Sequence, residues 1–270
     1  MSEEVPFRKR FRLYKDRVIG RGTYSTIFEG KDESTGSAVA IKYVRTLSLT
    51  PSEKRHVLSE IGILQKIRHK NIIRYVDSYV GKTRIMIALE YCTGGTLRDY
   101  MNEHICDEAE ARVLFVQIMD AVQYLVDHNI SHRDIKPANI LLSTPTTEQG
   151  VMPVVKVIDF GLAVERTRDL DDLCSTICGS PLYMAPEILL SQKYTDTCNI
   201  WSLGVVLYEM LFQTVPFTAT NIYELKRKHQ TQRLDTTQYL LRDVSSACRD
   251  VIVRMLSTDD RISWKDLYAH

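Results

Sequence analysis

The first third of the chain alternates between apolar and polar positions as β-strands do. Glycine or polar turns separate five runs rich in β-branched and aromatic residues, at 14–20, 25–31, 38–44, 72–79 and 84–90. One helix is predicted after Pro51, where Val57, Ile61 and Leu64 recur at helical spacing. Glu60 lies on the same apolar stripe. Because an acid on a buried face needs a partner, we expect a cation to lie opposite this helix.

The rest of the chain, from residue 96 onward, has a helical pattern. One stripe at helical spacing consists of Leu114, Ile118, Ala121 and Leu125. Residues 200–211 are apolar nearly all round, which is typical of a helix buried inside a domain.

These patterns predict an α+β fold with two lobes. A small sheet lobe with one helix spans residues 14–89, and a larger, mainly α-helical lobe spans residues 96–270. The paired glycines within residues 90–95 suit a short hinge between the lobes. Residues 1–13 form an N-terminal extension.

The composition is that of a globular protein, with 44% hydrophobic and 26% charged residues over 270 positions. This excludes a wholly disordered chain and a fibrous repeat. The 35 basic and 34 acidic residues give a formal net charge of +1. Such a balance predicts no nucleic-acid partner and favours a small ligand or a protein.

The cysteine spacing and the hydropathy favour a cytoplasmic location. The six cysteines form no CxxC pair, which argues against structural zinc and favours reduced thiols. No apolar run approaches the roughly 18 residues of a membrane span, and the N-terminus has no signal-peptide pattern. We therefore expect no membrane insertion.

Two features of the sheet lobe indicate a phosphate site. Gly20, Gly22 and Ser25 lie in a turn between two strands, and such a turn lets backbone amides approach a phosphate closely. A strand follows this turn, which excludes the dinucleotide-binding fold, where a helix follows. Lys42 lies on the next strand and can satisfy Glu60, which would hold the lysine beside phosphate oxygens. Taken singly, the turn could merely reverse the chain and the lysine could lie in solvent.

Three further motifs carry the chemistry, in the order HRDIKPAN at 132–139, DFG at 159–161 and APE at 185–187. Asp134 can accept the proton of an attacking hydroxyl, and Lys136 can neutralise a transferring phosphoryl group. Asn139 and Asp159 supply the hard oxygen ligands that Mg²⁺ prefers. With the glycine turn, Lys42 and Glu60, this is the signature set of protein kinases.

On these motifs the chain resembles a eukaryotic-type protein kinase domain from residue 12 to about residue 267. The resemblance implies a bilobal kinase fold with an antiparallel sheet lobe, an activation segment at 159–187, and ATP and Mg²⁺ as cofactors. It implies serine or threonine acceptors on protein substrates, since tyrosine kinases usually lack the lysine found at Lys136. The residues that it implies around ATP are Ile19, Gly20, Gly22, Ser25, Ile27, Ala40, Lys42, Leu89 as gatekeeper, and the backbone of Glu90 and Cys92.

Within this superfamily the chain is similar to the ULK family, which initiates autophagy. The similarity lies in TICGSPLYMAPE at 176–187, the lengthened loop at 143–150, and PFTATNIYEL at 216–225. It implies a role in autophagy initiation. Calcium/calmodulin-dependent and AMP-activated kinases share much of the first motif and stay open as alternatives.

The same resemblance implies control by phosphorylation. Arg133 and His56 can both face a phosphate on the activation segment. Thr176 is the first candidate for the modified residue and Ser175 the second. An upstream kinase or autophosphorylation would supply the phosphate.

Selectivity for the peptide can be predicted from the same motifs. Kinases that prefer arginine upstream of the acceptor carry glutamate at the position of Ala138 and often an acid at that of Thr96. We therefore expect peptides with hydrophobic flanks, bound by an apolar pocket of Ile177, Pro181 and Met184.

The remaining expectations concern the interior of the domain. Glu187 and Arg261 should form an ion pair within the helical lobe. Four side chains should stack between the lobes: Leu64, Tyr75, His132 and Phe160.

Asn199 departs from the pattern, since the family normally has an aspartate there that braces the catalytic loop. Asparagine can still accept a hydrogen bond and cap a helix, so we expect an active enzyme. A pseudokinase that acts as a binding scaffold is the alternative. A small-molecule phosphotransferase is disfavoured by the segment CGSPLYMAPE.

Overall fold

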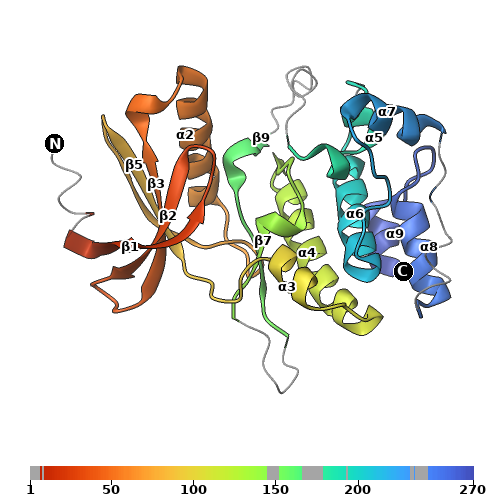
Figure 1. Cartoon of the computed structure of the whole chain (residues 1–270), viewed down its shortest axis with the longest axis horizontal. Helices are drawn as coiled ribbons and strands as arrows, with labels where there is room; N and C mark the ends of the chain where they lie inside the picture. Colours follow the sequence, from red (N-terminus) through yellow and green to blue (C-terminus); the bar gives the residue numbers. More distant parts are fainter. Residues whose placement is uncertain are drawn as a thin grey trace.

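The computed structural model describes residues 7, 9–144, 152–165, 179–192, 194–231, 234 and 243–270. Within these ranges a five-stranded antiparallel sheet and one helix come first, and helices form most of the rest. Figure 1 shows the sheet and α2 at one end of the molecule and α5 to α9 at the other. The predicted α+β fold, a sheet lobe followed by a helical lobe, is confirmed.

The sheet consists of β1 (Phe11–Arg21), β2 (Ser25–Asp32), β3 (Ala38–Arg45), β5 (Arg84–Glu90) and β4 (Tyr75–Val80), in that spatial order. β1 begins three residues earlier than predicted, because Phe11 is buried against the sheet with Phe7, their ring centroids 4.7 Å apart. β4 begins three residues later than predicted, because Ile72 forms an isolated bridge with Val157 instead.

Helix α2 (Pro51–Lys66) follows a short 3₁₀ turn, η1 (Thr46–Ser48), and starts at a capping box. The Thr50 hydroxyl accepts the Glu53 N–H at 3.2 Å, and the Glu53 carboxylate accepts the Thr50 N–H at 2.7 Å. The inner face of α2 packs on the sheet in one cluster of Val44, Val57, Ile61, Ile85 and Ile87. This packing carries Glu60, which is 3% exposed, toward the sheet.

The helical lobe contains α3 (Leu97–Glu103), α4 (Glu108–Asp127), α5 (Pro186–Leu189), α6 (Thr197–Phe212), α7 (Ile222–Thr231), α8 (Ser246–Met255) and α9 (Trp264–Ala269). Its short strands are β6 (Ile130–Ser131), β7 (Ile140–Leu142), β8 (Val155–Val157) and β9 (Val164–Glu165). Its 3₁₀ turns are η2 (Pro137–Asn139), η3 (Phe160–Leu162) and η5 (Pro181–Tyr183).

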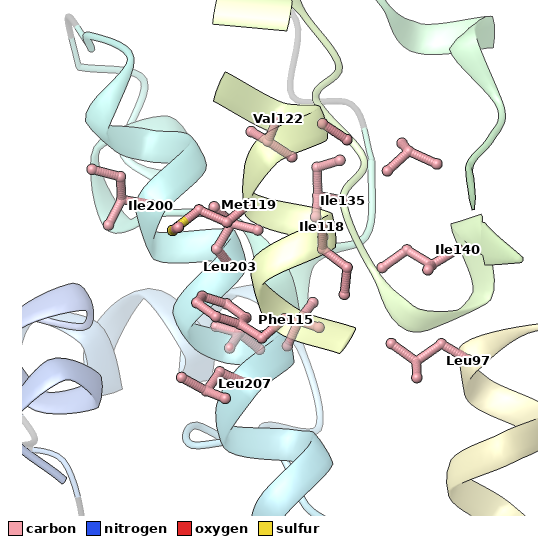
Figure 2. Close-up of a cluster of buried hydrophobic side chains, with 14 of the residues drawn as sticks. Leu97, Phe115, Ile118, Met119, Val122, Ile135, Ile140, Ile200, Leu203 and Leu207 are labelled. Carbon is pink, nitrogen blue, oxygen red and sulfur yellow. The ribbon is translucent and has the colours of Figure 1, made fainter. Parts of the chain in front are cut away.

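Helix α6 forms the centre of this lobe and is buried along most of its length, as its apolar sequence predicts. Figure 2 shows α4 and α6 side by side, with these labelled side chains between and around them: Phe115, Ile118, Met119 and Val122 of α4, and Ile200, Leu203 and Leu207 of α6. Gly204 lets α8 approach closely, since a Cβ there would lie 2.9 Å from that of Met255. The helical core therefore surrounds α6.

An aromatic cluster packs around Trp201, near the start of α6. Trp201 stacks on Phe217 with 5.7 Å between centroids, and His229 meets the Trp201 ring edge-on at 5.1 Å. The Arg261 guanidinium lies over Trp201 and forms the predicted ion pair with Glu187, at 2.6 and 3.0 Å. That prediction is confirmed.

No helix in the part of the chain that the structure describes combines the length and the apolar character needed to cross a membrane.

The first prediction concerns the α4–α6 contact. Ile118 is fully buried on α4, whereas Val116 on the same helix is 41% exposed. We expect Ile118→Ala to lower the free energy of unfolding by about 3 kcal/mol through lost burial and a residual cavity. Val116→Ala is the matched control and should change it by less than about 0.5 kcal/mol. Urea unfolding followed by circular dichroism measures both, and equal losses would contradict the assignment of the core.

The second prediction concerns His229, which is 4% exposed and whose ring nitrogens have no hydrogen-bond partner among the described residues. Burial lowers the pKa of His229 from 6.5 to about 4. The unfolded chain binds a proton below about pH 6.5 that the folded chain binds only near pH 4. Stability should therefore fall as the pH drops through this interval.

Replacing His229 by leucine removes this proton. The difference in unfolding free energy between His229→Leu and the unaltered chain should grow in favour of the variant from pH 7.5 to pH 4.5. Parallel pH curves for the two proteins would show that His229 is not the group responsible.

Candidate active site

Two short strand pairs position the motifs that carry the chemistry. β6 pairs with β9, and β7 pairs with β8. Residues 132–139 connect β6 to β7, and residues 158–163 connect β8 to β9, so each connection starts and ends beside the other. The HRDIKPAN and DFG segments are thereby held face to face.

His132 joins the two connections from inside. Burial lowers the pKa of His132, so the ring is neutral. Its Nε2–H donates to the Ile158 carbonyl at 2.9 Å, and Nδ1 accepts the Asp134 N–H at 3.4 Å. The ring also meets Phe160 edge-on, with centroids 5.0 Å apart.

Asp134 lies where three groups converge on its carboxylate. Oδ1 accepts the Ser180 N–H at 2.9 Å, and Oδ2 accepts the Asn139 amide at 2.8 Å. Lys136 Nζ lies 2.7 Å from Oδ2 and also donates to Ser180 Oγ at 2.7 Å. The structure thus brings together Asp134, Lys136 and Asn139, as the sequence predicts, and adds Ser180.

Gly179 allows this contact between the segment around Ser180 and the catalytic loop. Its φ is +106°, and a Cβ there would lie 2.5 Å from the Arg133 carbonyl oxygen. Arg133 and Asp159 have φ of 66° and 64°, a left-handed backbone that side chains adopt at some cost. Both loops are therefore held in conformations that surrounding contacts must maintain.

Lys42 and Glu60 form the predicted ion pair, with Nζ 2.6 and 2.8 Å from the two carboxylate oxygens. Lys42 Nζ also lies 3.6 Å from Asp159 Oδ1. Burial by itself would lower the pKa of Lys42, but the charges of Glu60 and Asp159 outweigh it and raise that pKa. The lysine is therefore a fixed positive charge next to Asp159.

Asn139 and Asp159 are suited to a divalent cation. The Asn139 Nδ2 donates both to the Asp134 carbonyl and to its carboxylate, which leaves the amide oxygen as the group for a ligand. Burial by itself would raise the pKa of Asp159, but the charge of Lys42 outweighs burial and lowers it, so the carboxylate is charged. No cluster of three or more His, Cys, Asp or Glu residues gathers in the described ranges. A cation would therefore complete its coordination with phosphate and water oxygens.

The residues expected around ATP share one face of the sheet. Ile27 is paired with Lys42, and Ala40 with Leu89, across adjacent strands. Residues opposite each other in an antiparallel pair, and those two apart on one strand, project from the same face. The pattern therefore places Ile27, Ala40, Lys42 and Leu89 together.

The glycine turn closes one edge of this face. The Gly22 N–H donates to the Ser25 carbonyl at 2.9 Å, and a Cβ on Gly22 would lie 2.8 Å from Ser25 Oγ. Gly20 is paired with Ile27, and Ile19 beside it is 42% exposed. A side chain at position 22 would therefore displace the Ser25 hydroxyl from this position.

The hinge residues have other contacts as well. The Glu90 N–H donates to the Arg74 carbonyl at 2.9 Å, and its carboxylate pairs with Lys156 at 2.8 Å. A ligand would therefore meet the Glu90 carbonyl rather than its N–H. Burial raises the pKa of the half-buried Cys92 thiol to about 11.

The four side chains of the expected stack lie in or against the core, and the rings of His132 and Phe160 are in contact. Leu64, His132 and Phe160 are at most 1% exposed, and Tyr75 is partly buried against the same cluster. The Tyr75 hydroxyl donates to Ser78 Oγ at 2.9 Å and accepts a hydrogen bond from Gln65 at 3.1 Å. The Tyr75 ring therefore packs against the core, while its hydroxyl is hydrogen-bonded to Ser78 and Gln65 at the edge of the core.

Of the residues expected to control activity, the structure describes Arg133 and His56. Thr176 and Ser175, together with Ile177 of the expected peptide pocket, lie outside the described residues. The Arg133 Nε donates to the Leu162 carbonyl at 2.7 Å, which fixes the guanidinium beside the end of the DFG segment. His56 is exposed on α2, one turn before Glu60.

Asn199 lies beneath the catalytic loop in the first turn of α6. Its side-chain amide donates to the Asp196 carbonyl at 3.2 Å, and Asp196 rather than Asn199 is the N-cap residue. The capping role considered for Asn199 is therefore wrong. With Ser131 and Arg133 it lines a cavity of about 20 Å³, large enough for one water molecule.

One part of the site was not predicted from the sequence. Arg98 of α3 donates to Tyr183 Oη at 2.8 Å and to Glu209 Oε1 at 2.7 Å, and Tyr183 donates to Glu209 Oε2 at 2.6 Å. Glu209 is buried on α6, and burial together with its carboxylate raises the pKa of Tyr183. The signal was available, because Glu209 is an acid within an otherwise apolar run and needs a partner, as Glu60 does.

Comparison with known proteins agrees with this geometry. A family model described as protein kinase domain matches residues 13–270. The serine/threonine-protein kinase ATG1b of Arabidopsis thaliana is 36% identical over 257 residues, which cover 94% of this chain and 35% of ATG1b. The serine/threonine-protein kinase ULK3 of Homo sapiens is 38% identical over 259 residues, covering 93% of this chain and 52% of ULK3. The chain spans between about a third and about half the length of these relatives.

The third prediction concerns the Arg98–Glu209 pair. Arg98→Ala leaves the Glu209 carboxylate buried without its cation, and we expect a loss of about 2 kcal/mol in unfolding free energy. The double variant Arg98→Ala/Glu209→Gln removes the stranded charge and should recover part of that loss. Urea unfolding of both variants measures this, and a double variant less stable than Arg98→Ala would contradict the charge argument.

Proposed function

The chain belongs to the protein kinase domain family as a serine/threonine kinase, and we propose that it transfers the γ-phosphoryl group of ATP to hydroxyls of protein substrates. The observation that carries this proposal is the arrangement around Asp134. Its carboxylate is held by Lys136, Asn139 and the Ser180 N–H. The Lys42–Glu60 ion pair is formed as well. These contacts support the proposal, because they orient groups that can position and stabilise a transferring phosphoryl group.

Asp134 is the base in this proposal. With Oδ1 and Oδ2 both accepting hydrogen bonds, the carboxylate is oriented to take the proton of a serine or threonine hydroxyl. Lys136 bridges Asp134 and Ser180, so its ammonium lies between the base and the segment that receives the acceptor. Its charge stabilises the phosphoryl group as it moves.

The nucleotide would be bound by the face of the sheet that carries Lys42. Ile19, Ile27, Ala40 and Leu89 supply apolar contacts to the base, and the Glu90 carbonyl and Cys92 N–H supply polar ones. The turn at Gly20, Gly22 and Ser25 approaches the phosphates, with Lys42 as their fixed cation. Asn139 and Asp159 would hold Mg²⁺, which neutralises phosphate charge when bound.

We further propose that the whole protein acts in autophagy initiation, as a cytoplasmic ULK-like kinase. The similarity to relatives named ATG1b and ULK3 supports the ULK-like assignment over the calcium/calmodulin-dependent and AMP-activated groups. Its control would come from phosphate on Thr176 or Ser175, added by an upstream kinase or by the protein itself. Arg133, held at the end of the DFG segment, and His56 are the cations to receive it.

The expected substrates have hydrophobic residues near the acceptor. Met184 is buried close to Gly179, in the segment that contacts Asp134. Ala138 contributes no charge. The Thr96 hydroxyl caps α3 by accepting the Asp99 N–H at 3.1 Å, so Thr96 serves the helix start. Peptide arrays dominated by arginine three positions before the acceptor would contradict this selectivity.

The fourth prediction tests the reaction itself. Labelled phosphate from Mg-ATP should enter a generic serine/threonine substrate and the protein itself. Asp134→Asn and Lys42→Met should each lower the rate at least about 100-fold, because they remove the base and the phosphate-binding cation. Asp127→Asn, an exposed carboxylate at the end of α4, is the matched control and should retain the rate.

Folded, ATP-binding protein that incorporates no phosphate, even after treatment with an upstream kinase, would favour the scaffold function. Asn199→Asp would then show whether the missing aspartate is the reason.

A further inference from the structure

A second concave site lies away from the glycine turn and the catalytic loop. It is a cavity of about 350 Å³ where the connection from α2 to β4, the end of β5 and strand β8 meet. We propose that this cavity binds an acidic segment of a partner polypeptide, through carboxylate or phosphate groups on successive residues. The site belongs to both lobes, because Arg74 comes from the sheet lobe and Lys156 from the helical lobe.

The lining is strongly positive. Arg68, Lys70, Arg74 and Lys156 line the cavity, and Glu90 is the one acid among its lining residues. The cations outnumber the carboxylate by three, whereas the whole chain has a formal net charge of only +1. A local excess of this size concentrates anionic partners at the cavity.

The cations are held in place to different degrees. The Arg68 guanidinium donates to the Leu64 and Ile67 carbonyls at 3.0 and 2.6 Å, at the end of α2. Lys70 Nζ is 4.0 Å from its nearest carboxylate, Asp120. Arg74 is exposed, and among the described residues no side chain pairs with its guanidinium. Arg74 and Lys70 are therefore available to a ligand.

The floor of the cavity is an ion pair that a ligand can compete for. Lys156 and Glu90 lie 2.8 Å apart with side chains only 13% and 17% exposed. The Glu90 Oε1 also accepts the Arg74 N–H at 2.7 Å. An incoming carboxylate or phosphate would approach Lys156 from the open side and share it with Glu90.

A polypeptide fits this arrangement better than a surface or a duplex. The cations come from two chain segments, the α2–β4 connection and β8, around a concavity whose volume is in the usual range for ligand sites. A flat membrane cannot enter it, and the near-neutral chain offers no broad footprint to nucleic acid. Several acidic side chains of one peptide can reach several of these cations at once.

Binding here should be coupled to the nucleotide site. Glu90 ends β5 and begins the hinge, two residues before Cys92. A ligand that shares Lys156 changes the partner of Glu90, and the affinities for the two ligands then change reciprocally. This coupling rests on the proposed ATP site, whereas binding of the peptide does not.

The test uses a fluorescent peptide of alternating Glu and phosphoserine residues and the chain saturated with a non-hydrolysable ATP analogue and Mg²⁺. Fluorescence anisotropy should show saturable binding that weakens as salt is raised. Lys70→Glu/Arg74→Glu should weaken it at least about tenfold, because two attractive charges become repulsive. The control Arg227→Glu/Lys265→Glu reverses two exposed cations outside the cavity and should change the affinity less than about twofold.

Several results would overturn the proposal: no saturable binding, equal losses in the two double variants, or displacement by inorganic phosphate at the same phosphate concentration. Lys70→Gln/Arg74→Gln replaces the charge reversals if these disturb folding, as judged by thermal unfolding, and should show a smaller loss in the same direction. Binding with an unchanged affinity for the ATP analogue would remove the coupling alone. Peptide binding by a chain that incorporates no phosphate would retain this site and reject the proposed catalysis.

Discussion

The ion pair between Lys42 and Glu60 sets the positions of the groups around it. Both side chains are largely removed from water, so either one would be costly to bury without an oppositely charged partner. The pair therefore requires α2 to lie against β3. Leu64, one turn after Glu60, is then buried in the same core as Phe160, and Phe160 follows Asp159 directly. A buried ion pair adds little net stability, but it specifies one arrangement, and here that arrangement places a metal-ligand candidate beside a fixed cation.

The same constraint operates a second time in the helical lobe. Glu209 is an acid on the most apolar helix of the described chain, and Arg98 and Tyr183 satisfy it from α3 and η5. Because Tyr183 follows Ser180 by three residues, this cluster also anchors the segment that contacts Asp134. The Ser202 hydroxyl adds a bond to the Tyr183 carbonyl at 2.8 Å. One buried acid in each lobe thus connects a helix to a segment of the candidate site.

Much of the fold was predictable because the spacing of apolar residues within one segment indicates which of its faces is buried. The strands, the helix with Glu60 on its inner face, and the buried helix at 200–211 all appear where the hydrophobic pattern places them. The boundaries were less predictable, since β1 starts where Phe11 finds Phe7, a contact that the alternation does not report. Lys42, Asp134, Lys136, Asn139 and Asp159 were identified by residue type and order.

The part of the site that was not predicted from the sequence depends on contacts between segments far apart in the chain. Nothing in the local sequence says that the Ser180 N–H reaches Asp134 or that Arg98 reaches Glu209. Glu209 could have been flagged as an acid needing a cation, but the sequence offers many cations and does not rank them. The capping role considered for Asn199 is wrong because α6 begins at Thr197 and Asp196 takes the N-cap position, which puts Asn199 inside the first turn.

Cys92 has a consequence for the chemistry of the hinge. With its pKa raised to about 11 by burial, the thiol carries its proton at neutral pH. Thiolate is the form that attacks electrophiles and oxidants, so this cysteine is a poor nucleophile. The thiol in the hinge should therefore react more slowly with oxidants than an exposed cysteine does. An alkylating inhibitor aimed at it would depend on the time it spends bound rather than on the reactivity of the thiol.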